Sequence, residues 1–393
     1  MNKQKQAQKI VIVGGGFGGC KAALELANKK GFEVTLISST NNFEYHGALY
    51  RSATGRSPME VVIPIKEILK RAHNVEFVLD TIARIDPAKN RLISVDGNEY
   101  HYDSVILALG NVVNYFGIEG MEQHSFALTT ITQTIALRNT LTKLFRDPGS
   151  KPGIAVVGGG ASGVELAGEL QHYAHMVAQK YGNKAAEPKV MLIEGADRVL
   201  PNLDPILSAR AYKRLHELGV ELRLNTKVNS CEQGKVCLSG EDIMADVIVW
   251  TAGSRGVDFY SQHPKVFTME KGRVKVDEYM RATAYGNVYV IGDNAFTPYT
   301  GMAQTALHDA NFVAGNLIRA SKNKKPASYR PRKPTYVIPV GPNWAVLQTD
   351  KYQWSGTRAW LARRQADKWI FKNFLPYKAA IKQWRRGNRL ADF

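Results

Sequence analysis

Continuously apolar runs recur along the chain, and most of them end at glycine or at a small polar residue. The first two cover residues 9–14 and 32–39, and we expect the segment 17–30 between them to be a helix. Apolar runs of this kind are typical of strands that are buried on both faces in a parallel sheet. Strand, glycine turn, helix and strand make one βαβ unit, so the pattern predicts an α/β fold.

The same order of elements occurs a second time. A strand and glycine turn at 154–163 open the second unit, and the strand at 189–195 follows its helix. The run at 245–253 is the counterpart of the run at 104–110 in the first half. One more apolar strand, at 287–295, comes too late to belong plainly to the second unit. The chain therefore carries an internal duplication of a whole domain rather than a series of short repeats.

The composition of the chain changes after residue 320. Residues 321–334 are rich in lysine and proline, and we expect them to form a surface linker. Residues 335–348 have the pattern of a hairpin that turns at Gly341 and Pro342. A basic and aromatic tail follows.

Length and composition are those of a soluble globular protein with two or three domains. The chain has 393 residues, of which 44% are hydrophobic and 22% are charged. No run approaches the roughly 18 consecutive apolar residues of a membrane span, so we expect no integral membrane protein. The polar N-terminus, MNKQKQAQK, has no apolar stretch that would mark an export signal. Three scattered cysteines, Cys20, Cys231 and Cys237, favour a reducing compartment.

Charge is concentrated at one end of the chain. The formal net charge is +17, and residues 351–393 hold eleven basic and two acidic residues together with four of the six tryptophans. A basic tail of this kind is typical of a nucleic-acid site, an anionic membrane surface or a solvated face. Composition alone leaves these three interpretations open.

Both glycine turns match the pattern G-x-G-x-x-G. The glycines are Gly14, Gly16 and Gly19 in the first turn, and Gly158, Gly160 and Gly163 in the second. In such a turn the first glycine bends the chain, the second lets a pyrophosphate approach the backbone, and the third lets the helix pack on the strand. The helix N-terminus then offers free N–H groups to the phosphates. Two such turns, each between a buried strand and a helix, predict two dinucleotide sites.

The position that contacts the ribose differs between the two copies. Glu194 ends the strand of the second unit, where a carboxylate accepts from a 2′-hydroxyl and repels a 2′-phosphate. The second site is therefore predicted to take NAD(H) rather than NADP(H). Ser38 and Ser39 occupy the matching place in the first unit, so the first site lacks the acidic signature.

Taken together, the motifs resemble those of the type II NADH:quinone oxidoreductases, which are two-dinucleotide-domain flavoproteins related to the FAD/NAD-linked disulfide oxidoreductases. The segments that carry the resemblance are IVIVGGGFGG, IAVVGGGASGVELAGEL, VIVWTAGS, NVYVIGDNA and AQTALHD. It implies a Rossmann-like domain for FAD, with a second such domain for NADH inserted into it and an amphipathic helical tail. The implied division is 1–120 and 281–348 for FAD, 121–280 for NADH, and 349–393 for the tail.

The resemblance also implies roles for single residues. Asp293 in IGDNA would lie against the ribityl and phosphate part of FAD, and Gly110 would lie in the turn over the flavin. Gly253 would approach the nicotinamide nucleotide. Glu165, near the start of the second helix, would face both the nicotinamide and the flavin, although an acid there also suits the helix dipole without any ligand.

The segment AQTALHD resembles the quinone-site sequence of this family. Ala303 and Gln304 match it, and His308 stands where the family has a second glutamine. Positions 304 and 308 share one helical face, so both side chains are predicted to line one pocket. A histidine satisfied elsewhere explains His308 equally well.

Because a quinone is dissolved in the membrane, we expect a peripheral membrane protein, and the missing export signal and the basic tail predict the cytoplasmic face. Tyr377, Ala380, Ile381 and Trp384 share a helical face opposite basic residues, which is typical of a helix lying on an anionic membrane surface. Residues 356–375 are less regular, and burial against another subunit competes there, which leaves a homodimer open. A nucleic-acid role explains the charge of the tail but neither dinucleotide fold.

The sequence lacks the motifs of other enzyme classes. The sequence has no C-x₂-C or C-x₄-C pair of a disulfide reductase, no Ser-His-Asp arrangement and no metal-binding cluster. We therefore predict an enzyme that passes a hydride from NADH to FAD and then two electrons to a quinone, without proton pumping. A related reductase using sulfide or a ferredoxin-type partner, or an NADH-responsive signalling flavoprotein, remains the alternative.

Overall fold

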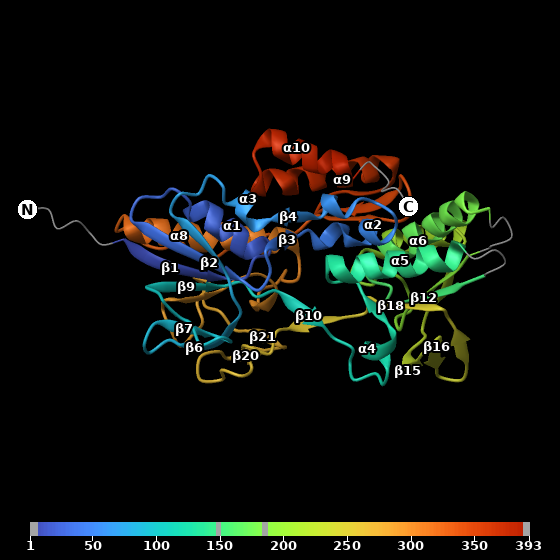
Figure 1. Ribbon diagram of the computed structural model, residues 1–393, viewed down its shortest axis with the longest axis horizontal. Coiled ribbons are helices and arrows are strands. Elements are labelled where there is room, and N and C mark those ends of the chain that lie inside the picture. The colour runs from blue at the N-terminus through green and yellow to red at the C-terminus, as the bar shows by residue number, and fades with distance from the viewer. Residues whose placement is uncertain (1–6, 147–150, 183–187, 388–393) are drawn as a thin grey trace, which may run out of the picture.

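Two five-stranded parallel sheets organise the molecule (Figure 1), in a computed structural model that describes residues 7–146, 151–182 and 188–387. The strand order of the first sheet is β22-β9-β1-β2-β5, and every pairing is parallel. Its strands are β1 (Gln8–Val13), β2 (Phe32–Ser38), β5 (Val75–Leu79), β9 (Ser104–Leu107) and β22 (Val288–Val290). The α/β fold predicted from the apolar runs is confirmed.

The late strand β22 pairs with β9 although about 180 residues separate them in sequence. The run at 287–295 therefore returns to the first sheet, as the resemblance implied. Helices α1 (Phe17–Leu26) and α8 (Ala303–Ser321) pack side by side on this sheet. The first helix ends earlier than predicted, because the chain turns at Asn28, whose φ is +58°.

The second sheet repeats the plan with the order β11-β18-β12-β13-β14, again with parallel pairings throughout. Its strands are β11 (Phe126–Ala127), β12 (Gly153–Val157), β13 (Lys189–Ile193), β14 (Glu221–Arg223) and β18 (Val247–Trp250). Its helices are α5 (Ile131–Arg146), α6 (Ala161–Lys180) and α7 (Pro205–Glu217). The duplication predicted from the sequence is thus a duplication of sheets.

Small antiparallel sheets and short helices decorate both units. The sheets are β3 (Asn42–Glu44) with β4 (Val62–Pro64), β6 (Ile82–Asp86) with β7 (Arg91–Ser94) and β8 (Glu99–His101), β15 (Val228–Glu232) with β16 (Lys235–Leu238) and β17 (Asp242–Met244), and β20 (Met269–Glu270) with β21 (Arg273–Val274). The short helices are η1 (His46–Ala48), α2 (Leu49–Ala53), η2 (Pro58–Glu60), α3 (Ile65–Ile68), α4 (Met121–His124) and η3 (Gly292–Asn294).

The chain crosses between the two sheets at one place. Strands β10 (Asn111–Val113) and β19 (Ser254–Gly256) pair antiparallel, so the outgoing and returning segments lie side by side (Figure 1). Residues 257–280, assigned to the NADH domain from the sequence, contribute apolar side chains to the core of the first sheet. These are Phe259, Tyr260, Val266, Phe267, Val274 and Met280.

The C-terminal region adds a third layer. The predicted hairpin is confirmed as β23 (Tyr336–Pro339) and β24 (Ala345–Gln348), with Gly341 at φ +72° in the turn, and β25 (Gln353–Gly356) extends it. Residues 324–334 before it form neither helix nor strand and are mostly exposed, as expected of a linker.

Two helices follow, α9 (Thr357–Phe374) and α10 (Tyr377–Arg386), and they lie along the upper edge of the molecule in Figure 1. The last residues of the predicted tail, 388–393, are outside the described residues. Among the helices that the structure describes, none combines the length and apolar character needed to span a bilayer.

Apolar side chains dock α9 and α10 onto the first unit. Ile370, Phe371 and Phe374 are buried in its core, where the ring of Phe374 lies 4.5 Å from that of Phe43, centroid to centroid. For residues 356–375 the sequence left open a contact with lipid or with another subunit. In the structure, the apolar side of this segment instead packs against its own chain.

The helical face predicted to contact a membrane has a different neighbour. Ala380 is completely buried, and the indole N–H of Trp384 donates to the carbonyl of Arg364 at 2.8 Å. Tyr377, in contrast, is 61% exposed. Helical periodicity shows that a helix has an apolar face, but it does not show whether lipid or protein covers that face.

A buried acid on α9, Asp367, holds this interface together. Its carboxylate oxygens lie 3.1 Å from Arg51, 3.0 Å from Arg364 and 3.0 Å from Arg363, and one accepts from the hydroxyl of Tyr45 at 2.7 Å. Burial alone would raise the pKa of Asp367, but the three arginines keep it below its usual value. Asp367 is therefore ionised while only 1% exposed.

A second buried acid, Glu60, closes the same cluster from the first unit. It lies 2.9 Å from Arg51 and 3.4 Å from Arg364. Arg51 also donates to the carbonyl of Gly387 at 2.6 Å, and the side-chain amide of Gln383 donates to the carbonyl of Glu60 at 2.9 Å. The end of α10 is thus fixed by polar contacts.

Removing one charge from this cluster should be costly. In Asp367→Asn three arginines lose their shared anion inside the protein, which typically destabilises by about 3–5 kcal/mol. Equilibrium urea denaturation followed by circular dichroism measures this loss. Asp350→Asn is the matched control, because Asp350 pairs with Lys333 at 2.7 Å on the exposed surface, where a pair contributes roughly 0–1 kcal/mol. Equal effects of the two substitutions would contradict the structural role given to Asp367.

Candidate functional site

The outer glycines of both turns are packed against backbone. A Cβ on Gly19 would lie 1.8 Å from the carbonyl oxygen of Gly14, and a Cβ on Gly163 would lie 1.8 Å from that of Gly158. Gly14 and Gly158 themselves have φ of +114° and +113°, which other residues rarely adopt. The protein's own backbone therefore requires glycine at these four positions.

The middle glycines are different. A Cβ built on Gly16 or on Gly160 would meet no protein atom within 4 Å. Each of these residues is the N-cap of its helix, α1 or α6, and neither helix has a side-chain cap there. Both turns therefore present open space in front of free N–H groups, as a pyrophosphate requires.

Ser38 and Glu194 occupy equivalent places beside the two turns. A Cβ on Gly15 would lie 2.5 Å from the hydroxyl of Ser38, and a Cβ on Gly159 would lie 3.0 Å from the side chain of Glu194. Ser38 is buried at the end of β2, whereas Ser39 is exposed. The two residues that the sequence predicted to be equivalent therefore occupy equivalent positions in the two units.

Backbone groups hold the carboxylate of Glu194 at the second turn. One oxygen accepts from the N–H of Gly159 at 2.5 Å, and the other accepts from the N–H of Ala196 at 2.7 Å. These two bonds orient the acid at the mouth of the turn, where an acid binds ribose hydroxyls in dinucleotide sites.

The predicted residues around the first site converge on the end of β9. Gly110, with φ +69°, follows this strand and has open space at its Cα. Asp293 in η3 accepts from the side-chain amide of Asn111 at 2.6 Å, and burial raises the pKa of Asp293. Asn294, which the sequence reasoning missed, donates to the carbonyl of Gly110. These residues form one wall at the carboxyl edge of the first sheet.

Gly253 lies where the segment that packs on the second turn enters the crossing between the units, since Ala252 and Thr251 before it lie against Gly158. A Cβ there would lie 2.5 Å from the ring of Phe116. The indole of Trp250 donates to the carbonyl of Asn114 at 3.0 Å in the same region. Gly253 is therefore needed for the close approach of the two crossing segments as well as for any nucleotide.

Gln304 and His308 share one face of α8, as predicted, and both hold the extended segment before β23. The amide of Gln304 donates to the carbonyl of Thr335 at 2.8 Å and accepts from its N–H at 3.2 Å. His308 Nε2 lies 2.9 Å from the carbonyl oxygen of Arg330. Ala303, the first residue of the helix, is partly exposed beside them.

Glu165 lies in the first turns of α6 and meets the C-terminal tail. Its carboxylate accepts from Arg363 of α9 at 2.9 Å, and Glu165 is only 7% exposed. Burial raises the pKa of Glu165 to about 7, and the charge of Arg363 opposes the rise. A carboxyl group that titrates near neutral pH at the head of a dinucleotide-binding helix is suited to proton transfer.

The sequence did not identify Arg363 as a site residue. Besides Glu165 and Asp367, its guanidinium donates to the carbonyls of Val337 at 2.9 Å and of Gly47. The arginine belongs to a basic tail that the sequence presented as a surface feature, and no local pattern marks it as buried. Only the fold brings residues 165 and 363 together.

Within the described residues, no group of histidines, cysteines and acids is arranged to hold a metal ion. Cys20 is buried and bonds the carbonyl of Gly15 at 3.1 Å, and burial raises its pKa to about 12. Cys231 lies in the β15-β16 sheet, where burial raises its pKa to about 11. These two thiols are therefore protonated and poor nucleophiles.

Comparisons with known proteins agree with this geometry. A family model for pyridine nucleotide-disulphide oxidoreductases matches residues 8–310. The type II NADH:quinone oxidoreductase Ndh of Mycobacterium tuberculosis is 30% identical over 380 residues, covering 90% of this chain and 82% of that protein. The family match includes both glycine turns.

Solved structures share the whole architecture. NDH2 of Plasmodium falciparum in complex with NADH superposes with a TM-score of 0.87 at 18% identity, covering 98% of both chains. The sulfide:quinone oxidoreductase of Aquifex aeolicus reaches a TM-score of 0.79 at 20% identity, covering 97% of this chain and 92% of that one. At these identities the likeness shows the fold alone, which proteins with different electron donors share.

The two kinds of glycine should respond differently to an added methyl group. Gly160→Ala should fold normally but weaken NADH binding by about tenfold or more, ~1.4 kcal/mol, because only the ligand's space is filled. Gly163→Ala should instead fail to fold or lose most of its stability, because its Cβ collides with the backbone of Gly158. Calorimetric NADH titration and urea denaturation measure the two effects. Loss of stability in Gly160→Ala, or unchanged NADH affinity, would contradict this assignment.

Proposed function

The chain belongs to the pyridine nucleotide-disulphide oxidoreductase family, among the type II NADH:quinone oxidoreductases, and we propose that it oxidises NADH and reduces a quinone through bound FAD. The observation that carries this proposal is the pair of turns whose middle glycines, Gly16 and Gly160, face space that the protein does not fill. In both turns this space lies in front of the uncapped N–H groups of a helix start, where a pyrophosphate would bind.

The first turn fits FAD. Bound FAD would supply the redox chemistry, accepting a hydride from NADH and passing two electrons to the quinone. The N–H groups at the start of α1 would hold its pyrophosphate beside Gly16, and Ser38 would bond a ribose hydroxyl. Asp293 and Gly110 supply a polar wall and an open backbone position at the end of the same sheet.

The second turn fits NADH. The start of α6 at Gly160 would hold the pyrophosphate, and the oriented carboxylate of Glu194 would accept from the ribose hydroxyls. A 2′-phosphate would meet the same negative charge, so NADH should be preferred over NADPH. Glu165 and Gly253, further along this unit, would border the nicotinamide end.

For the acceptor we propose a quinone site walled by α8. Ala303, Gln304 and His308 lie on this helix beside the extended segment that Gln304 and His308 hold. The amide and the imidazole can each donate to a quinone oxygen. Sulfide as donor is disfavoured, because Cys20 and Cys231 are protonated thiols committed to packing.

An absorption experiment tests the proposed function. The purified protein should show the flavin bands of FAD, lose them on addition of NADH in the absence of oxygen, and regain them on addition of a soluble quinone. Parallel assays with sulfide as donor and with a ferredoxin as acceptor serve as the comparison. A colourless protein that takes up no FAD, or a flavin that stays oxidised under excess NADH, would rule out this function.

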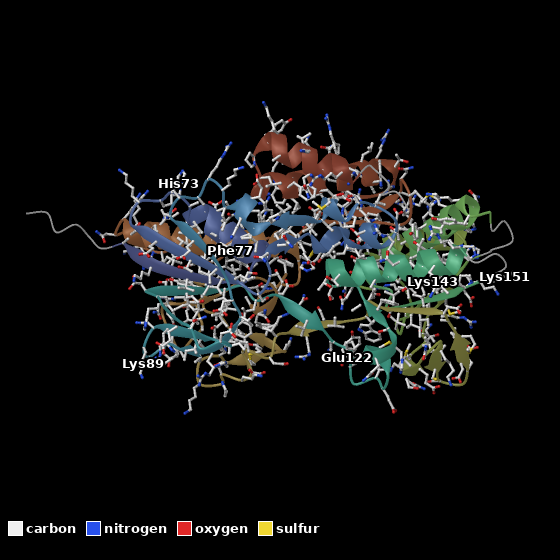
Figure 2. The ribbon with its side chains drawn as sticks, in the orientation of Figure 1. His73, Phe77, Lys89, Glu122, Lys143 and Lys151 are labelled. Atoms are coloured by element: carbon white, nitrogen blue, oxygen red, sulfur yellow. The ribbon has the colours of Figure 1, made fainter. Side chains whose placement is uncertain are left out.

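We also propose that the outer side of the tail contacts an anionic membrane, on the cytoplasmic face. Leu361, Trp369 and Tyr377 are 51%, 50% and 61% exposed on α9 and α10. The exposed basic residues of these helices include Lys372, Lys378, Lys382 and Arg385. Figure 2 shows nitrogen-tipped side chains pointing away from both helices along the upper edge of the molecule. Aromatic and basic groups together suit the headgroup region of anionic lipid.

Charge reversal tests the membrane contact without removing the buried part of the tail. The double substitution Lys378→Glu and Lys382→Glu should weaken binding to phosphatidylserine vesicles by about 2 kcal/mol or more, roughly thirtyfold, since each basic residue near the surface is worth about 1 kcal/mol. Vesicle co-sedimentation measures the change. The control reverses Lys89 and Lys143, exposed residues that Figure 2 places on other elements. Equal weakening by both pairs would contradict a membrane contact through the tail.

A further inference from the structure

An exposed phenylalanine lies in the segment that leads from the first unit to the second. Phe116 is the third residue after β10, and it is 62% exposed although its side chain is large and apolar. The neighbouring Tyr115 instead packs against Trp250, which belongs to a buried cluster on the second sheet. Because most of the Phe116 ring stays in contact with water, it contributes little to the free energy of folding.

The backbone at Phe116 is strained for this type of residue. Phe116 has a φ of +52° and Gly117 has a φ of +70°, and the N–H of Ile118 donates to the carbonyl of Tyr115 at 3.0 Å. Two successive left-handed residues closed by such a bond are typical of a type I′ turn, whose first central position favours asparagine, aspartate or glycine. The side-chain oxygen of Asn114 accepts from the N–H of Phe116 at 3.0 Å and holds the turn. A bulky side chain at this position costs stability.

The turn points the ring toward the second dinucleotide site. A Cβ on Gly253 would lie 2.5 Å from Cε2 and 2.7 Å from Cζ of Phe116, so the tip of the ring lies against Gly253. The carbonyl of Gly253 accepts from the N–H of Asn114 at 3.1 Å, which fixes the two segments together. Two residues earlier, the hydroxyl of Thr251 donates to the carbonyl of Gly158 at 3.1 Å. The ring is therefore held beside the segment that packs on the second glycine turn.

This position suits the nicotinamide end of a dinucleotide. Gly253 follows β18 at the carboxyl edge of the second sheet, and open α/β sheets bind their ligands at this edge. Gly110, in the wall of the first site, directly precedes β10, so the segment that carries Phe116 runs from one site to the other. In the proposed function the nicotinamide has to lie between the two sites, where it can meet the flavin.

Neither lipid nor core packing accounts for the exposed ring. The elements that flank its segment, β10 and α4, lie away from α9 and α10, which follow the upper edge of the molecule in Figure 1. Trp250 is 3% exposed, and the ring of Phe116 meets it only edge to face, with 6.3 Å between the ring centroids. The strain at residue 116 is thus not compensated by burial of its side chain.

Resting on the proposed function, we infer that Phe116 is an NADH-binding residue, whose ring covers the nicotinamide end of the bound dinucleotide. Planar rings attract one another in offset or edge-to-face arrangements, and the free side of the Phe116 ring is available for such a contact. The contact would also exclude water from the nicotinamide. The strained turn fixes the ring before the ligand binds, so less conformational freedom is lost on binding.

Substitutions that separate the ring from the turn test this inference. Phe116→Asn removes the ring but supplies a residue that suits the left-handed turn. It should leave the midpoint of urea denaturation unchanged or higher, yet weaken NADH binding about tenfold, as expected for the loss of one aromatic contact. Phe116→Tyr keeps the ring and should bind NADH as the unsubstituted protein does. Calorimetric titration of the holoprotein, with its flavin already reduced, measures the affinity without turnover.

ADP-ribose, which lacks the nicotinamide ring, shows which end of the dinucleotide Phe116 contacts. Its affinity should be the same in Phe116→Asn and in the unsubstituted protein. Tyr212→Ala is the control, because Tyr212 is an aromatic residue on α7 of the same unit and is 41% exposed. This control should bind both ligands normally.

Three results would overturn the inference: unchanged NADH affinity in Phe116→Asn, equal weakening of NADH and ADP-ribose, or a clear loss of stability in this variant, which would give the ring a structural role. An unsubstituted protein that binds no NADH would instead remove the proposed function, so the two failures are distinguishable.

Discussion

One guanidinium joins the two dinucleotide units, the hairpin and the C-terminal helices of this protein. Arg363 comes from the C-terminal helix α9, yet it donates to Glu165 on the second dinucleotide unit and to the carbonyl of Gly47 on the first. It also donates to Val337 of the hairpin and to Asp367 on its own helix. Arginine is suited to this role, because its planar fork can serve several acceptors at once and stays charged when buried.

Arg363 belongs to a cluster of ionisable side chains. Three arginines, Arg51, Arg363 and Arg364, face three acids, Glu60, Glu165 and Asp367, and none of these side chains is more than 12% exposed. A buried cluster of this kind contributes little net stability compared with apolar packing, but losing any one member leaves an unpaired charge. The cluster therefore fixes the position of the tail more strongly than it stabilises the fold, and apolar contacts such as Phe374 on Phe43 supply the stability.

Much of the two dinucleotide units could be predicted from sequence because their signals are local. A buried parallel strand is an apolar run, and a glycine turn such as Gly158–Gly163 is written within six residues. The return of β22 to the first sheet needed the resemblance, since no local pattern says which sheet a late strand joins. The placement of residues 257–280 with the first core escaped prediction for the same reason.

The packing of the tail could not be predicted from the sequence. Periodicity identified α10 as a helix with an apolar side, but Ala380 is completely buried and Trp384 is partly buried against protein. The buried ion pairs between the tail and the two units link residues about 200 to 300 positions apart. In the sequence, the arginines of these pairs cannot be distinguished from surface basic residues. The basic segment that the sequence presented as a surface tail therefore lies, in the fold, against the candidate site at Glu165.

This arrangement limits what the tail can be. An anchor that only held the protein to a surface would need exposed aromatic and basic residues, which α9 and α10 have, but no buried acid and no contact with Glu165. Because Arg363 and Trp369 belong to the same helix, a surface contact that moves α9 must also act on the carboxyl group of Glu165. By thermodynamic linkage, the protonation state of Glu165 then acts on the surface contact by an equal free energy. Under the proposed membrane contact, the charge of Glu165 and the surface contact of α9 would therefore belong to one equilibrium.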